Sequence, residues 1–171
     1  ALHTDPLSSA YEAVCLAEIE RLDLGESVRM VTDFLAPEVA HLLLSTADVV
    51  ALPYHASAES SSAALRFVLP VGRAVLASDI GIFADASDCL VLVEAPPTPE
   101  DLADVLSRLV NDPRALDEYA AKSLHLAHES SLDRSTAEHT KVYRDVLAER
   151  ASRHGPGLVT DAPPSRDEVQ K

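Results

Sequence analysis

Short apolar runs separated by helical patterns constrain the fold of this 171-residue chain more than any other feature. Four runs rich in Val and Leu are continuous rather than alternating, as in parallel strands that are covered on both faces. They occupy residues 28–32, 48–52, 74–78 and 90–93. Because helical patterns lie between the runs, we expect right-handed βαβ crossovers. The sequence therefore predicts an α/β fold, a Rossmann-like parallel sheet in three layers.

The helices are predicted from apolar spacing and from residues typical of helix ends. Pro37 and Pro113 occupy the favoured first position of two of them, and Thr98 precedes a third as its N-cap, with Asp101 as an early acid. The predicted ranges are 7–22, 37–46, 59–69, 99–111, 113–129 and 131–150.

Two domain-level expectations follow from this pattern. Residues 1–151 form one domain, and residues 152–171, with two glycines, adjacent prolines and few large apolar groups, form a flexible tail. The chain opens directly on a helix, whereas a doubly wound half-domain normally opens with a strand. We therefore expect that strand 1 is missing and that the chain is a fragment cut just after it.

Composition excludes several functional classes. Fourteen Lys and Arg against 28 Asp and Glu give a formal charge of −14, which repels nucleic acid and anionic membrane surfaces. The sequence has no apolar run long enough to span a membrane and no secretion signal pattern. Cys15 and Cys89 have apolar neighbours and no CxxC partner, so we expect buried, reduced thiols and a cytoplasmic protein.

Seven histidines show neither HxH nor HExxH spacing, so no metal site is expected. His125 and His128 share a predicted helix face without acidic partners, and we interpret them as exposed surface. A nucleophile elbow and a GxGxxG loop are both missing from the sequence, which argues against a hydrolase or a dinucleotide enzyme.

The most informative stretch reads ADVVALPY over residues 47–54, ESSS over 59–62 and GRAVLASD over 72–79. A strand ends near Pro53, a loop crosses the carboxyl edge of the sheet, and a helix is predicted to begin at Glu59. Ligands of open parallel sheets bind at that edge. The free backbone amides of residues 60–62 would form a binding site for a diphosphate or a sugar hydroxyl. A serine-rich cap on a buried helix explains the same residues without a ligand.

The ordered series of motifs resembles the C-terminal, donor-binding domain of GT-B glycosyltransferases, specifically family GT4 (glycosyl transferases group 1). The resemblance covers residues 28–150, and ESSSAALR is similar to a variant in bacterial polysaccharide-building members. It implies a retaining hexosyltransferase that moves sugar from a nucleoside diphosphate sugar to a saccharide or lipid-linked acceptor. It also implies no cofactor, and an N-terminal half-domain as partner. Without that half the isolated chain is expected to be inactive.

Individual site residues carry over from the resemblance by position. Glu59 matches the first glutamate of a Glu-x7-Glu motif and would lie against the donor sugar. The second glutamate falls at Phe67, which cannot accept the hydrogen bonds of ribose hydroxyls. Arg66 either binds the diphosphate or lies on a solvated surface. The candidate donor-binding residues are Glu59, Ser60, Ser61, Ser62, Arg66, His55 and Tyr54.

Two other functional classes remain open on the sequence. A non-catalytic GT-B-like module for binding or interaction is favoured by Phe67 and by the lack of any lysine before Lys122, since the family uses an Arg and a Lys near the first helix. A response-regulator-like domain fits the size and acidity. However, Asp33, Asp48 and Asp79 are not spaced to form the acidic pocket that it requires.

Overall fold

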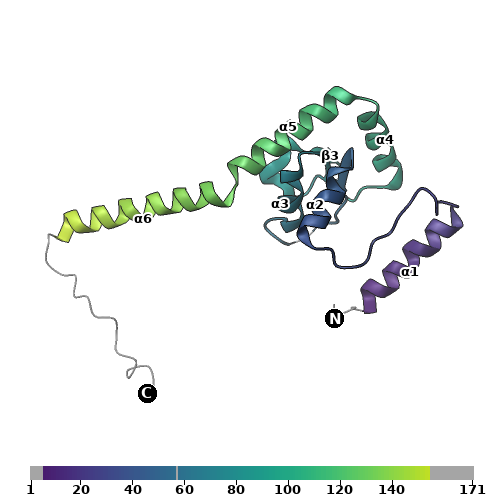
Figure 1. Ribbon diagram of the computed structural model, residues 1–171, viewed down its shortest axis with the longest axis horizontal. Coiled ribbons are helices and arrows are strands. Elements are labelled where there is room, and N and C mark those ends of the chain that lie inside the picture. The colour runs from purple at the N-terminus through teal and green to yellow at the C-terminus, as the bar shows by residue number, and fades with distance from the viewer. Residues whose placement is uncertain (1–5, 57, 155–171) are drawn as a thin grey trace, which may run out of the picture. The chain divides into compact units, whose positions relative to one another are not determined.

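The computed structural model describes residues 6–56 and 58–154. Contacts among Cα atoms divide the chain into two units, Ala1–Ala47 and Asp48–Lys171. The predicted domain of residues 1–151 therefore contains the boundary between the two units. Figure 1 labels helices α1 to α6 and strand β3, numbered in chain order. In the described ranges, no helix is both long and apolar enough to cross a membrane.

The first unit contains two helices, α1 (Pro6–Arg21) and α2 (Pro37–Ser45), and both were predicted. Pro37 occupies the first turn of α2, where its missing N–H costs no hydrogen bond. The last turn closes when the Thr46 N–H donates to the carbonyl of Leu43 at 3.1 Å. Local signals therefore place both helices correctly.

The predicted strand over residues 28–32 is wrong. Residues 28–32 have no regular structure, and the described sheet consists of three other segments. The Val28 N–H donates to the carbonyl of Leu24 at 2.8 Å, in the turn that follows α1. Val28, Met30 and Val31 are exposed. An apolar run indicates a preference for burial, but a strand also requires a neighbouring strand to complete its hydrogen bonds.

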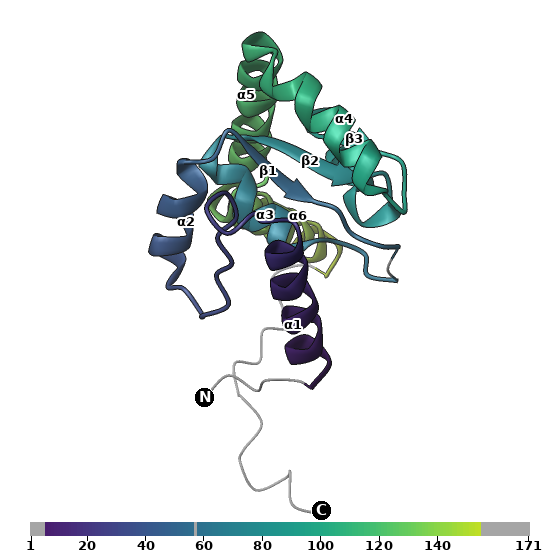
Figure 2. The same ribbon diagram turned by 90° about the vertical axis from the view of Figure 1, so that its right-hand side faces the viewer.

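The second unit is built on a parallel sheet of strands in the order β1-β2-β3 (Figure 2). Their bounds, which agree with the predicted runs to within one residue, are Val49–Leu52, Ala74–Ser78 and Val91–Val93. Val50 pairs with Val75, and Leu76 pairs with Val91. All five residues of β2 are buried, so this strand forms the centre of the core.

Short helices connect the strands. Between β1 and β2 lie α3 (Ala63–Val68) and the 3-10 turn η1 (Leu69–Val71), and between β2 and β3 lies the 3-10 helix η2 (Gly81–Cys89). The largest buried side chains of these connections are Leu65, Leu69, Ile82 and Phe83. These side chains belong to the buried core of the unit, and burial of their apolar area stabilises it.

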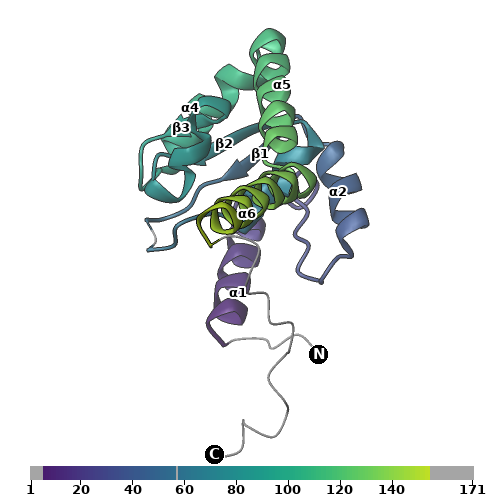
Figure 3. The same cartoon turned by 90° about the vertical axis from the view of Figure 1, so that its left-hand side faces the viewer.

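Three further helices complete the unit, α4 (Pro99–Val110), α5 (Pro113–Glu129) and α6 (Leu132–His154). Helix α5 packs against β2, η1 and η2, and α4 packs against β3 and α5 (Figure 3). Asp112 caps α5 by accepting hydrogen bonds from the amides of Arg114 and Ala115, each at 3.1 Å. The predicted range of α5 is confirmed at both ends.

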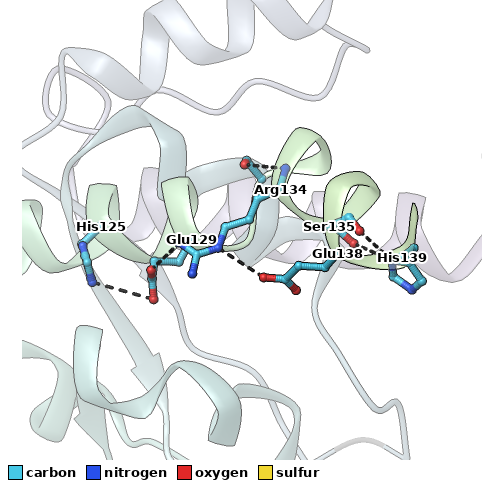
Figure 4. Close-up of polar contacts among 7 residues, drawn as sticks. His125, Glu129, Arg134, Ser135, Glu138 and His139 are labelled. Carbon is cyan, nitrogen blue, oxygen red and sulfur yellow. Dashed lines mark hydrogen bonds and ion pairs between the residues drawn. The ribbon is translucent and has the colours of Figure 1, made fainter. Parts of the chain in front are cut away.

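Exposed charges line the turn from α5 into α6 (Figure 4). The Arg134 guanidinium contacts the Glu129 carboxylate at 2.6 Å and the Glu138 carboxylate at 3.4 Å. Both carboxylates raise the pKa of Arg134, with Glu129 contributing most. Because all three groups are exposed to solvent, these pairs contribute little stability.

Helix α6 differs from its prediction in two ways. Its apolar side chains Val142, Tyr143, Val146 and Leu147 are exposed rather than packed. The helix also continues to His154 and so includes the first three residues of the predicted tail. Residues 155–171, on which the remainder of the tail prediction falls, lie outside the described residues.

The start of α4 offers a test of local stability. The Thr98 hydroxyl donates to the Asp101 carboxylate at 2.6 Å and accepts from the Asp101 amide at 3.1 Å, while the Thr98 amide donates to that carboxylate. Thr98→Ala is expected to lower the free energy of unfolding by about 1 kcal/mol. Urea denaturation monitored by circular dichroism measures this loss. Thr136→Ala, at an exposed position of α6 that is not an N-cap, is the control.

The cap also makes a pH-dependent contribution. The hydrogen bond from the Thr98 hydroxyl, and then the one from its amide, holds the pKa of Asp101 below its ordinary value. A depressed pKa in the folded state stabilises the protein above the unfolded pKa, and this contribution is lost as the pH falls through the folded pKa. The effect of Thr98→Ala should therefore shrink in acid. An effect that is equal at pH 7 and pH 3 would contradict the role of the Asp101 carboxylate.

Candidate functional site

The loop of residues 53–62 leaves the carboxyl end of β1 and carries most of the predicted site residues. It opens with a tight turn, in which the Tyr54 N–H donates to the carbonyl of Leu52 at 2.9 Å across Pro53. The half-buried ring of Tyr54 lies against the buried ring of Phe83, with centroids 5.5 Å apart. His55 follows and is exposed. The structure thus places Tyr54 and His55 at the edge where ligands of such sheets bind.

The helix after this loop begins later than predicted, at Ala63 instead of Glu59. The Ser62 hydroxyl accepts the Leu65 N–H at 3.1 Å, so Ser62 is the N-cap and is itself buried. Glu59, Ser60 and Ser61 are exposed and belong to the loop. The amides of Ser60 and Ser61 therefore do not belong to the first helical turn. Their contact with a ligand stays a prediction, now based on an exposed loop.

Arg66 lies in the last turn of α3 and forms an ion pair with Asp85 of η2. It also lines a cavity of about 500 Å³ that includes residues of η1, α5 and the start of α6. No described residue of the loop lines this cavity. Glu59 precedes the helix and therefore shares no helix face with Arg66. The structure brings Arg66 to Asp85, a partner that the sequence analysis missed.

Phe67 and Gly72 occupy two motif positions of the resemblance. Phe67 is half-buried in α3, a helix whose Leu65 and Val68 side chains are buried. Gly72 ends η1 in the left-handed conformation, with φ 67°. Turn geometry therefore explains the glycine without a ligand.

A cavity of about 520 Å³ between η2 and α5 was not anticipated from the sequence. Its lining comes from two distant segments of the chain and includes Asp85, Asp88, Cys89, Lys122 and His125. Burial raises the pKa of the Cys89 thiol, and its sulfur donates to the carbonyl of Ala86 at 3.0 Å. This cysteine is therefore a protonated thiol of the core at neutral pH.

The other titratable candidates match their predictions in part. Both cysteines are free thiols, but only Cys89 is buried, while Cys15 is half-buried. His125 and His128 are exposed as predicted, and His125 lies 3.9 Å from the Glu129 carboxylate. Across residues 6–56 and 58–154, no cluster of three or more His, Cys, Asp or Glu side chains could hold a metal ion.

The comparisons with known proteins bear on the fold. No family model matches the sequence, and no curated protein matches it either. Among solved structures, the chain is similar to sucrose-phosphate synthase from Thermosynechococcus elongatus, with a TM-score of 0.68 and 18% sequence identity. The fold of this chain is therefore similar to that of part of a sugar-transferring enzyme.

The match covers 85% of this chain and 37% of the synthase. At 18% identity the likeness extends to the fold and no further. The α/β, Rossmann-like parallel sheet predicted from the sequence is therefore confirmed, while membership of family GT4 and correspondence to a C-terminal domain stay predictions.

Proposed function

We propose that the loop of residues 53–62 binds a nucleoside diphosphate sugar, and that the chain is the donor-binding part of a retaining glycosyltransferase. The acceptor is a saccharide or a lipid-linked saccharide in the assembly of bacterial polysaccharide, in the cytoplasm. An N-terminal half-domain completes the enzyme and supplies the acceptor-side groups.

The observation that carries this proposal is the position of the loop within a glycosyltransferase fold. The loop starts at the carboxyl end of β1, beside the end of the central strand β2. It presents an acid, two serines and a half-buried tyrosine to solvent within eight residues, 54–61. The order of these motifs is the one that resembles the donor-binding domain.

Each exposed group has a chemical role in this proposal. The Glu59 carboxylate accepts hydrogen bonds from sugar hydroxyls, and the hydroxyls and amides of Ser60 and Ser61 donate to the diphosphate. His55 lines the same edge. No cofactor is assigned, because amide dipoles and basic groups stabilise the leaving diphosphate in this mechanism. The net charge of −14 means that this attraction must be local.

Arg66 has a more restricted place in the proposal. Its guanidinium is paired with Asp85, so it reaches a diphosphate only when that ion pair opens. An exposed pair of this kind costs about 1 kcal/mol or less to break. Arg66 therefore contributes less to donor binding in this proposal than Glu59 and the two serines do.

A second candidate function is a non-catalytic module that binds the same class of ligand. It is favoured by Phe67, which stands where a ribose-binding glutamate is expected and lies half-buried in α3. A phenyl ring cannot accept hydrogen bonds from the ribose hydroxyls, so another group would have to bind them. Weak ribose binding is compatible with a sensor as well as with an enzyme.

Calorimetric titration of the intact protein with UDP, GDP and their glucose and mannose derivatives tests the proposal. Binding of one sugar nucleotide, together with sugar transfer to a saccharide acceptor, supports the enzyme. Binding without transfer under the same conditions supports the non-catalytic module. Absence of binding by every probe contradicts both.

A further inference from the structure

Tyr54 and Phe83 connect the two chain segments that leave the carboxyl edge of the sheet at β1 and β2. Tyr54 follows β1, and Phe83 lies in η2, which follows β2. Their ring centroids are 5.5 Å apart and their planes are tilted by 48°. This separation is within the range that aromatic pairs favour. The contact therefore ties the beginning of loop 53–62 to η2.

Phe83 is the fixed member of the pair. Its side chain is only 1% exposed, and its N–H donates to the carbonyl of Ile80 at 3.0 Å. The Ile80 N–H in turn donates to the carbonyl of Ser78, and the Asp79 N–H to the carbonyl of Val93. The two residues that precede η2 are thus hydrogen-bonded to the ends of β2 and β3, and Phe83 is hydrogen-bonded to one of them. Phe83 cannot move without disturbing the core.

Both ends of the loop are anchored, and the described residues between them are exposed. Tyr54 anchors its start through the contact with Phe83, and the buried N-cap Ser62 anchors its end. Between them, residues 55, 56 and 58–61 are exposed, and Glu59 is among these. Releasing one anchor would increase the number of conformations available to the loop, and donor binding would then have to order it.

We propose that Phe83 is a positioning residue of the donor site, which acts through the ring of Tyr54 to hold loop 53–62 and Glu59 in the conformation that binds the donor. This inference rests on the proposed function. Phe83 touches no ligand in this scheme. Its contribution passes through Tyr54, and loss of either ring weakens donor binding about fivefold, the scale of one aromatic pair.

A double-mutant cycle tests this coupling in the intact protein. The variants are Phe83→Leu, Tyr54→Leu, the two combined, and Tyr54→Phe, with UDP-glucose and GDP-mannose as calorimetric probes. Tyr143→Leu, at an exposed site of α6, is the matched control. We expect each single leucine variant to weaken binding about fivefold and the double variant to be no weaker than Tyr54→Leu. Tyr54→Phe, which keeps the ring, should bind within about twofold of the wild type.

If the affinity losses of the two single variants multiply in the double variant, the inference is overturned, because Phe83 then acts independently of Tyr54. Unchanged affinity in a folded Phe83→Leu variant would also overturn it. If that variant fails to fold, as judged by thermal melting, Tyr54→Leu and Tyr54→Phe decide the matter. The role of the Tyr54 ring is overturned if Tyr54→Leu leaves the affinity unchanged. It is also overturned if Tyr54→Leu and Tyr54→Phe lower the affinity equally.

A readout without ligand separates this inference from the proposed function. Order parameters from ¹⁵N relaxation report the mobility of the amides of residues 58–61. Phe83→Leu and Tyr54→Leu should lower them, and Tyr143→Leu should leave them unchanged. Unaltered order parameters overturn the positioning role even if the wild type binds both probes. Lowered order parameters in a protein that binds neither probe support the positioning role and contradict the donor assignment.

Discussion

Gly72→Ala is expected to destabilise the protein by about 2 kcal/mol, because the left-handed conformation costs an L-residue about that much. Gly72 has φ 67° and ends η1 immediately before β2. An added Cβ would also lie 2.8 Å from Cγ of Leu124, on the helix that packs against β2. The Leu124 side chain, which is about half exposed, would have to change its conformation. Strain and lost packing therefore act in the same direction.

Thermal unfolding monitored by circular dichroism measures this effect. For a domain of this size we expect the Tm to fall by roughly 5–10 °C. Gly81→Ala is the matched control, since an added Cβ there meets no atom within 4 Å and the residue has no positive φ. Equal Tm changes in the two variants would show that neither the backbone conformation of Gly72 nor its contact with Leu124 matters for stability.

Glu59→Gln is expected to separate the sugar from the diphosphate in donor binding. In the proposed site the carboxylate accepts hydrogen bonds from sugar hydroxyls, yet it lies near an anion that it repels. Glutamine keeps one acceptor and removes the repulsion. The full sugar nucleotide should therefore bind more weakly by about 1–3 kcal/mol, whereas the bare nucleoside diphosphate should bind equally well or more tightly.

Calorimetry with both ligands on the intact protein measures the two effects. Glu100→Gln, an exposed change of the same charge in α4, is the control and should alter neither affinity. If Glu59→Gln weakens both ligands equally, or affects neither, Glu59 is an ordinary loop residue and the site lies elsewhere.

Features specified by neighbouring residues were predictable from the sequence alone. The run AVLAS defines β2, because continuous small and branched apolar residues suit a strand buried on both faces. Pro113 and Thr98 mark helix starts, because each satisfies local backbone geometry or hydrogen bonds that the helix leaves open. These signals extend over a few residues and depend little on what packs against them.

The start of α3 shows the limit of that reasoning. Three consecutive serines offered several possible N-caps, and the structure uses Ser62, whose hydroxyl accepts the Leu65 N–H while its side chain is buried. Burial of Leu65 and Val68 against the core determines which serine is chosen. The spacing of serines in the sequence contains no information about that packing.

Contacts between distant segments were decided only by the tertiary structure. The run at residues 28–32 is as apolar as a strand but has no regular structure. Arg66 pairs with Asp85 nineteen residues away, and Tyr54 contacts Phe83 in the segment that follows the neighbouring strand. The apolar pattern of a segment indicates how strongly it favours burial, but many different partners could bury it equally well. Which partner a side chain meets depends on the order and register of the strands that carry both, and these are set by the packing of the whole unit.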